Sequence, residues 1–220
     1  MKGPSGGKIW PIYEVFFMKV VILASGEGTN AENILSFSKI RKSQFEIRGL
    51  ISDQPNAKVL EKAKKWNIPV ALIEKKLGRE AHERAILSQI SLWEGDWVFL
   101  AGYMRILGHT FLSHFFDSKF GLSKIINIHP SLLPSFKGLR AYERAFEANV
   151  PSSGVSVHFV NEGVDTGPLI LQKSFPRKEG DLFEDFQKRG KEKEFQAYRE
   201  AIDIICKRYK EGLWSPSVLK

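Results

Sequence analysis

Short apolar runs alternate with amphipathic stretches over most of this chain. The apolar runs lie at Val20 to Ala24, Phe45 to Ile51, Val70 to Ile73, Val98 to Ala101 and Lys124 to Ile128. Such runs are typical of strands buried on both faces of a parallel sheet. Helical spacing follows Asn30 and recurs near Ala57 to Trp66, Arg79 to Trp93 and Gly108 to Asp117. Alternating strands and helices predict an α/β fold with a doubly wound, mostly parallel, Rossmann-like sheet.

The pattern changes in the last third of the chain. Two apolar runs, Val155 to Val160 and Pro168 to Phe175, are joined by a short turn with no helix between them. This arrangement predicts an antiparallel C-terminal strand pair, and we expect His158 to be a hydrogen-bonded core residue of its first strand. Residues Asp181 to Gly212 predict one long C-terminal helix, in which Gly190 marks a break or kink.

The length of 220 residues suits one domain. We expect residues 1–17 to be an N-terminal extension and residues 18–220 to be a single domain. The apolar part of the extension, Ile9 to Phe17, contains Pro11 and Glu14, which argues against a secretory signal and favours an irregular strand along the body. The one cysteine, Cys206, excludes a disulfide framework and fits a core position. A reducing cytoplasm is the expected compartment.

The net charge of +8 is compatible with nucleic acid, a membrane surface or small anions as partners. The basic residues are scattered among acidic ones, which does not build the basic stripe of a nucleic-acid-binding protein. No run approaches the ~20 apolar residues of a membrane helix. We therefore expect small anionic substrates as partners, with neither nucleic acid nor a membrane, and a monomer or weak homodimer.

The strongest chemical signal is Asn127-Ile128-His129-Pro130 at the end of the run Lys124 to Ile128. The following prolines, Pro130 and Pro134, stop a regular sheet or helix, so a stiff loop begins here. Side chains two residues apart share one face of a strand, so Asn127 and His129 converge. With a carboxylate from Asp165 in the later acidic turn, they form a set suited to proton transfer and oxyanion stabilisation.

A glycine loop follows the first apolar run. Gly26-x-Gly28-x-x-Ala31 fits the dinucleotide fingerprint, and Asp53 ends the next run where a ribose hydroxyl would bind. An NAD-dependent oxidoreductase is therefore an alternative from another class. Asp53 also suits a turn, which we favour. The same loop would serve a simpler phosphate ester through main-chain N–H groups at the start of the following helix.

Five separated stretches of the sequence resemble the phosphoribosylglycinamide formyltransferases, the folate-dependent formyltransferases of purine synthesis. They are Val20 to Asn30 (VVILASGEGTN), Ala101 to Leu107 (AGYMRIL), Asn127 to Pro134 (NIHPSLLP), Gly154 to Val160 (GVSVHFV) and Asp165 to Gln172 (DTGPLILQ). The likeness extends from Met18 to about Leu213. It implies a cytoplasmic transferase that uses 10-formyltetrahydrofolate as co-substrate and glycinamide ribonucleotide as acceptor, with no metal.

The resemblance also implies roles for particular residues. Asn127, His129 and Asp165 would be catalytic, and the acceptor's phosphate would bind at Gly28, Thr29 and Asn30. Glu194 would hold the substrate amine. The folate would contact Arg79, Met104, Arg105, Ile106, Leu107 and Asn127, with Arg79 facing its glutamate carboxylate.

Two departures concern the acceptor rather than formyl transfer. Thr166 follows Asp165 where this branch commonly has glycine, and the chain from Tyr198 onward matches poorly. A formyltransferase acting on a sugar-nucleotide amine is the alternative within the same chemistry. Related enzymes that act on methionyl-tRNA, or that hydrolyse the folate, carry further domains for which we expect no room here. A binding module without activity is disfavoured because Asn127, His129 and Asp165 are all present.

Overall fold

The computed structural model describes residues 18–42, 44–74, 76 and 78–212, so the predicted extension 1–17 lies outside the described residues. The strands are β1 (Met18–Leu23), β2 (Phe45–Ser52), β3 (Val70–Leu72), β4 (Trp97–Leu100), β5 (Phe116–Asp117), β6 (Leu122–Ser123), β7 (Ile125–His129), β8 (Ser152–Phe159) and β9 (Leu169–Pro176). The helices are α1 (Thr29–Ile40), α2 (Lys58–Lys65), α3 (Arg79–Leu92), α4 (His109–His114), α5 (Ala141–Glu147) and α6 (Phe183–Glu211).

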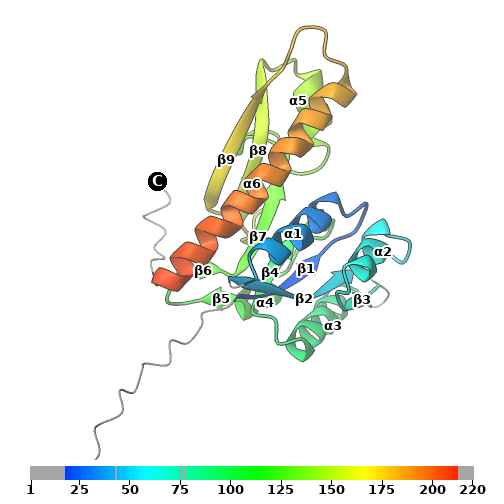
Figure 1. Cartoon of the computed structure of the whole chain (residues 1–220), viewed down its shortest axis with the longest axis vertical. Coiled ribbons are helices and arrows are strands. Elements are labelled where there is room, and N and C mark those ends of the chain that lie inside the picture. The colour runs from blue at the N-terminus through cyan, green and yellow to red at the C-terminus, as the bar shows by residue number, and fades with distance from the viewer. Residues whose placement is uncertain (1–17, 43, 75, 77, 213–220) are drawn as a thin grey trace, which may run out of the picture.

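Seven strands form one sheet in the order β3-β2-β1-β4-β7-β8-β9 (Figure 1). The first five strands in that order pair in parallel, whereas β8 pairs antiparallel with β7 and with β9. This confirms the predicted parallel sheet with an antiparallel addition. Strand β7 is the seam, because it has a parallel neighbour on one side and an antiparallel neighbour on the other.

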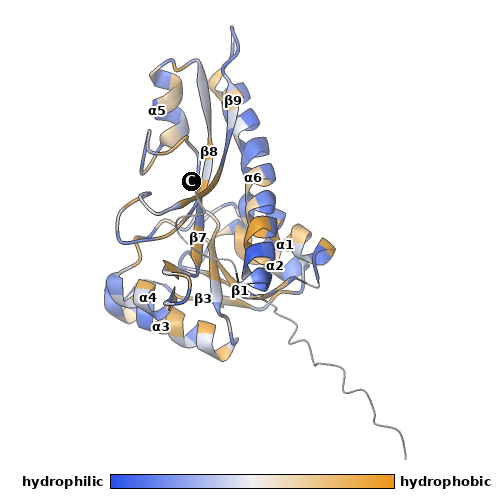
Figure 2. Cartoon of the chain, turned by 90° about the vertical axis from the view of Figure 1, so that its left-hand side faces the viewer, coloured by the Kyte–Doolittle hydropathy of each residue, from blue (hydrophilic) through white to orange (hydrophobic). Residues whose placement is uncertain are grey.

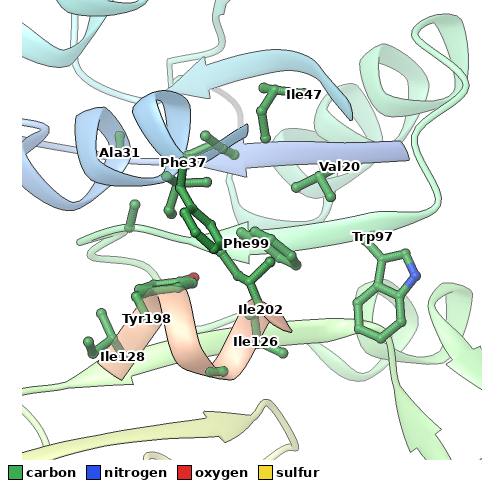
Figure 3. Close-up of a cluster of buried hydrophobic side chains, with 14 of the residues drawn as sticks. Val20, Ala31, Phe37, Ile47, Trp97, Phe99, Ile126, Ile128, Tyr198 and Ile202 are labelled. Carbon is green, nitrogen blue, oxygen red and sulfur yellow. The ribbon is translucent and has the colours of Figure 1, made fainter. Parts of the chain in front are cut away.

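Helices cover both faces of the sheet, as the uninterrupted apolar runs require (Figure 2). On one face, side chains of β1, β2, β4, β7 and β8 pack against α1, α2 and the second half of α6. Phe99 lies at the centre of this cluster, beside Phe37 of α1 and Tyr198 of α6 (Figure 3). On the other face, α3 and α4 cover a second cluster that includes Val21 and Val98. Two covered faces give the doubly wound layering.

A third cluster holds the antiparallel end of the molecule together. Tyr142 and Ala145 of α5 pack with Phe175 of β9 and Phe186 of α6. Helix α5 was not predicted from the sequence, because seven residues give too little periodicity to separate a helix from a loop. It also extended the fourth predicted helix to Asp117, whereas α4 ends at His114 and a small antiparallel pair, β5 with β6, follows.

Of the break or kink expected at Gly190, the break is wrong. Helix α6 runs without interruption from Phe183 to Glu211. A Cβ atom at residue 190 would lie 2.3 Å from Cε1 and 2.4 Å from the hydroxyl oxygen of Tyr142. Glycine at this position therefore allows α5 to approach α6 closely, which compensates for the low helix propensity of glycine, about 1 kcal/mol below alanine.

Among the residues that the structure describes, no helix has both the length and the apolar content needed to span a bilayer.

Candidate active site

The carboxyl ends of the parallel strands bring the predicted site segments to one edge of the sheet. The loop after β1 is bonded to the loop after β4: Ser25 N–H donates to the Gly102 carbonyl at 3.1 Å, and Met104 N–H donates to Ser25 Oγ at 3.0 Å. Strand β7 lies beside β4 and ends at His129 on the same edge. The glycine loop, residues 104–107 and the Asn-x-His motif are thus neighbours, as expected for an α/β ligand site.

The shared face predicted for Asn127 and His129 is confirmed by the sheet register. Across the β7–β8 pair, Asn127 lies opposite His158, and His129 lies opposite Ser156. Directly paired residues of antiparallel strands project to the same face. The intervening Ile128 pairs with Val157 and faces the apolar cluster on the other side. The amide and two imidazoles therefore share one face.

Asp165 meets His129, as the sequence analysis predicted. Its Oδ2 lies 3.2 Å from Nδ1 of His129, and the two side chains are 10% and 6% exposed. Gly138 N–H donates to the same Oδ2 at 2.8 Å, and Nε2 of His158 lies 3.5 Å from Oδ1, at the limit of a hydrogen bond. On its other side, His129 Nε2 lies 2.8 Å from the Phe136 carbonyl oxygen. Asp165 therefore orients the His129 ring from a position between two imidazoles.

The pKa values of His129 and Asp165 both lie below their ordinary values, but for different reasons. Burial lowers the pKa of His129, and this outweighs the opposite effects of the Phe136 carbonyl and the Asp165 charge. The Asp165 carboxylate favours the charged form of the ring, but the net pKa of His129 lies below its ordinary value. Burial alone would raise the pKa of Asp165, but the nearby His158 ring, the hydrogen bond from Gly138 and the nearby His129 lower it below the usual value.

Side chains from the antiparallel strands fix the proline loop after His129. Ser156 Oγ accepts from Leu133 N–H at 3.0 Å and donates to the Ser131 carbonyl at 2.6 Å. Gln172 Nε2 donates to the Leu133 carbonyl at 3.0 Å. Because Ser131 and Leu133, at the start of the loop, are bonded to β8 and β9, the position of His129 depends on the hairpin that also carries Asp165.

The glycine loop has the backbone geometry predicted for it. Gly28 has a φ of 74°, and a Cβ atom there would lie 2.5 Å from Cγ2 of Val59, so glycine is required. No side chain caps the start of α1. The first main-chain N–H groups of this helix, which include those of Thr29 and Asn30, are therefore available to an anion.

Glu194 lies at this end of the site, inside a small polar cluster. Its carboxylate accepts from Nδ2 of Asn30 and from the Tyr142 hydroxyl, the latter at 2.6 Å. Only 8% of Glu194 is exposed. Burial raises its pKa, and the two hydrogen bonds offset this only in part. Glu194 thus contacts a predicted phosphate residue directly, and its contact with a substrate amine stays a prediction.

The predicted folate side combines apolar and basic groups. Met104 and Ile106 are 66% and 60% exposed, which is unusual for such side chains and leaves apolar surface free at the site. Leu107 is instead part of the core cluster against α3 and α4. Arg79 starts α3 and pairs with Glu83 at 3.0 Å. Glu83 also accepts from Gly108 N–H at 2.8 Å, so Arg79 borders the end of this segment.

Asp53 does not have the surroundings of a ribose-binding acid. Its side chain is 1% exposed, and Oδ2 lies 2.7 Å from Nε of Arg105. Burial alone would raise the pKa of Asp53, but hydrogen bonds from Ser25 and Arg105 lower it overall. The carboxylate therefore holds the 104–107 segment against the glycine loop. The NAD-dependent alternative required Asp53 to bind a ribose hydroxyl. It is wrong on this point, because the buried Asp53 side chain is paired with Arg105.

Three residues of the site were not found from the sequence. His158 was expected in the core and does lie there, yet it also faces Asp165; its position opposite Asn127 on the inward face of β8 was the available signal. Tyr142 and Arg144 lie on the unrecognised helix α5, so no local pattern pointed to them.

Comparisons with known proteins agree with this geometry. The family model described as formyl transferase matches residues 18–202. The phosphoribosylglycinamide formyltransferase of Bacillus subtilis is 40% identical over 186 residues, which covers 84% of this chain and 92% of that protein. The chain spans 18% of the trifunctional purine biosynthetic protein adenosine-3 of Gallus gallus, at 37% identity.

Solved structures give the same result. The crystal structure of phosphoribosylglycinamide formyltransferase from Bacillus halodurans has a TM-score of 0.76 at 41% identity and covers 84% of this chain and 93% of its own. Glycinamide ribonucleotide transformylase 1 from Symbiobacterium toebii has a TM-score of 0.82 at 35% identity, with 92% and 93% covered. The chain belongs to the formyl transferase family and, within it, to the phosphoribosylglycinamide formyltransferases.

Proposed function

We propose that this protein transfers the formyl group of 10-formyltetrahydrofolate to the amine of glycinamide ribonucleotide, a step of purine biosynthesis, giving formylglycinamide ribonucleotide and tetrahydrofolate. The observation that carries the proposal is the buried His129–Asp165 pair, 3.2 Å apart, on the strand-end face shared with Asn127. It occurs in a chain whose family relatives bear the name of this activity. Residues 18–220 would act as one formyltransferase domain.

The chemistry required is acyl transfer without a covalent enzyme intermediate. The substrate amine attacks the formyl carbon, a C–N bond forms, and the oxygen of the tetrahedral carbon gains negative charge. The Asn127 amide and an N–H of the His129 ring would donate to that oxygen. The bond from the formyl carbon to N10 of the folate then breaks, and the proton lost by the amine passes to N10.

Asp165 supports the imidazole in this scheme. Because burial disfavours the charged ring, the ring depends on Asp165 to become an imidazolium as negative charge develops on the substrate. The low pKa of Asp165 means that this carboxylate is ionised at neutral pH. The proton lost by the amine would pass to N10 through Asp165 or through a water molecule beside it.

Binding of the two substrates is divided between the two sides of the site. The phosphate of the ribonucleotide would bind the N–H groups of Gly28, Thr29 and Asn30. The pterin ring would pack on the exposed Met104 and Ile106 and on the main chain of residues 104–107. Arg79, whose side chain is 52% exposed, would meet the glutamate carboxylate of the folate.

An acceptor assay tests the proposal directly. The protein is incubated with 10-formyltetrahydrofolate and glycinamide ribonucleotide, and tetrahydrofolate formation is followed by absorbance while the formylated ribonucleotide is identified by mass spectrometry. A parallel reaction contains a sugar-nucleotide amine instead. We expect transfer to the ribonucleotide only. Transfer to the sugar amine alone would overturn the proposed acceptor, and no transfer to either would overturn the proposed reaction.

A further inference from the structure

One main-chain carbonyl beside the proposed catalytic pair is shared by two side chains. The Phe136 oxygen lies 2.8 Å from Nε2 of His129, and Nη2 of Arg144 donates to it at 2.7 Å. The same Nη2 donates to the Lys137 carbonyl, and the guanidinium carbon lies 6.0 Å from the centroid of the Phe136 ring. Arg144 on α5 therefore holds residues 136–137 through two carbonyls and one aromatic ring.

The segment that Arg144 holds is bonded to both members of the pair. Phe136 bonds to His129, and Gly138 N–H donates to Asp165. Phe136 and Gly138 have φ values of 53° and 77°. A phenylalanine in the left-handed region is uncommon and persists only where contacts hold it. The contacts of Arg144 with Phe136 provide that restraint.

Each ring nitrogen of His129 faces an acceptor oxygen, so neither is free for a substrate. Nδ1 faces Asp165 and Nε2 faces the Phe136 carbonyl. To donate to the formyl oxygen, one of the two ring nitrogens must leave its present partner. Leaving Asp165 would separate the ring from the carboxylate that favours its charge. Leaving Phe136 would cost less, because the carbonyl still accepts from Arg144 and is not left unpaired.

We propose that Arg144 is a positioning residue, which keeps the Phe136 carbonyl hydrogen-bonded while Nε2 of His129 turns from that carbonyl to the formyl oxygen. This inference rests on the proposed function. Arg144 does not itself touch the substrate and acts through Phe136 and His129. Its charge also opposes protonation of the ring. The charged and titratable groups that affect His129 are Asp165 on the β8–β9 turn, His158 on β8 and Arg144 on α5.

The test compares three variants. Arg144→Met removes the charge and the donors but keeps the length of the side chain, and Arg144→Lys restores the charge and one donor. Arg177→Met is the matched control, because Arg177 makes the same two kinds of contact away from His129. It donates to the main-chain carbonyl of Phe146, and its guanidinium carbon lies 4.1 Å from the centroid of the Phe146 ring. We expect Arg144→Met to lower kcat about tenfold with unchanged KM for both substrates. Arg144→Lys should recover most of this loss, and Arg177→Met should leave kcat unchanged.

An NMR titration of the His129 ring gives a readout that does not depend on activity. The pKa of His129 should rise in Arg144→Met, because a positive charge is removed, and should stay at the parent value in Arg144→Lys and Arg177→Met. Equal losses of kcat in Arg144→Met and Arg177→Met, or an unchanged pKa in Arg144→Met, would overturn the proposal. If the parent protein fails the acceptor assay, the proposed function falls, whereas the titration still decides whether Arg144 acts on His129.

Discussion

Two buried carboxylates lie at opposite ends of the site, and their pKa values are shifted in opposite directions. Asp165 belongs to the proposed catalytic end, with a side chain that is 10% exposed, and Glu194 belongs to the proposed ribonucleotide end, with 8% of the residue exposed. Burial raises the pKa of both groups. The net result is opposite, because the pKa of Asp165 is below its ordinary value and that of Glu194 is above it.

The donors around each carboxylate explain the difference. Asp165 receives a main-chain N–H from Gly138 and lies beside the imidazoles of His129 and His158. Glu194 accepts from neutral partners, a tyrosine hydroxyl and an asparagine amide. Similar burial therefore accompanies a lowered pKa at the proposed catalytic carboxylate and a raised pKa at the carboxylate that holds Asn30. We expect changes at the catalytic end to lower kcat, and changes at the ribonucleotide end to raise KM.

The largest effect is expected for Asn127→Ala. Loss of one oxyanion donor should lower kcat by about 10²- to 10³-fold, with little change in folate binding. Steady-state kinetics and folate calorimetry measure the two quantities. Asn127→Asp serves as a shape-matched variant that also lacks the donor, so it should be equally slow. A near-normal kcat in either protein would remove Asn127 from the mechanism.

Asp165→Asn should have the next largest effect, a fall in kcat of about 10²-fold. The sign of the pKa change follows from the charges: Asp165 raises the pKa of His129, so its removal should lower that pKa further, and the charged ring should disappear at a lower pH. NMR titration of the His129 ring measures this. Asp181→Asn is the control, because Asp181 is a carboxylate paired with Arg189 at the start of α6. An unchanged His129 pKa in Asp165→Asn would contradict the comparison.

Gly28→Val tests the ribonucleotide end. The new side chain would meet Val59 rather than the phosphate itself, so the loop must shift and lose its left-handed geometry. We expect the Kd for the ribonucleotide to rise by about tenfold or more, while folate binding is kept. Calorimetry with each substrate separates the two effects. Gly26→Ala is the matched control in the same loop, because no atom lies within 4 Å of its Cβ position. Equal losses for both substrates would contradict the assignment.

Glu194→Gln should have the smallest effect, a rise in KM for the ribonucleotide of less than about tenfold with kcat kept. Because the folded-state pKa of Glu194 is raised, its ionisation makes folding less favourable as the pH rises above the unfolded value near 4.5. Glutamine does not ionise, so the free energy of unfolding of the variant, relative to the parent, should increase with pH above that value. Urea unfolding at several pH values measures it, and a constant difference would show that Glu194 is not destabilised by burial.

The periodicity of apolar residues was sufficient to predict the parallel sheet. The alternation of side chains along β7 was sufficient to predict that Asn127 and His129 share one face. The resemblance and the acidic turn together located Asp165. The sequence did not reveal the contacts between distant segments: Tyr142 meets Glu194 across 52 residues, and Arg144 reaches a carbonyl that only the loop conformation exposes. Contacts of this kind depend on how α5 packs on α6, and no spacing along the chain encodes them.

The close approach at Gly190 has a consequence for engineering this enzyme. Replacing a glycine inside a long helix with alanine is a standard way to raise thermal stability, and the gain in helix propensity is about 1 kcal/mol. Here the added methyl group would collide with Tyr142. The tyrosine in turn bonds to Glu194, which bonds to Asn30 at the start of α1. A substitution chosen to make the helix more robust would therefore disturb the contacts of Asn30, so at this position we expect a change in helix stability to be coupled to the proposed phosphate-binding end of the site.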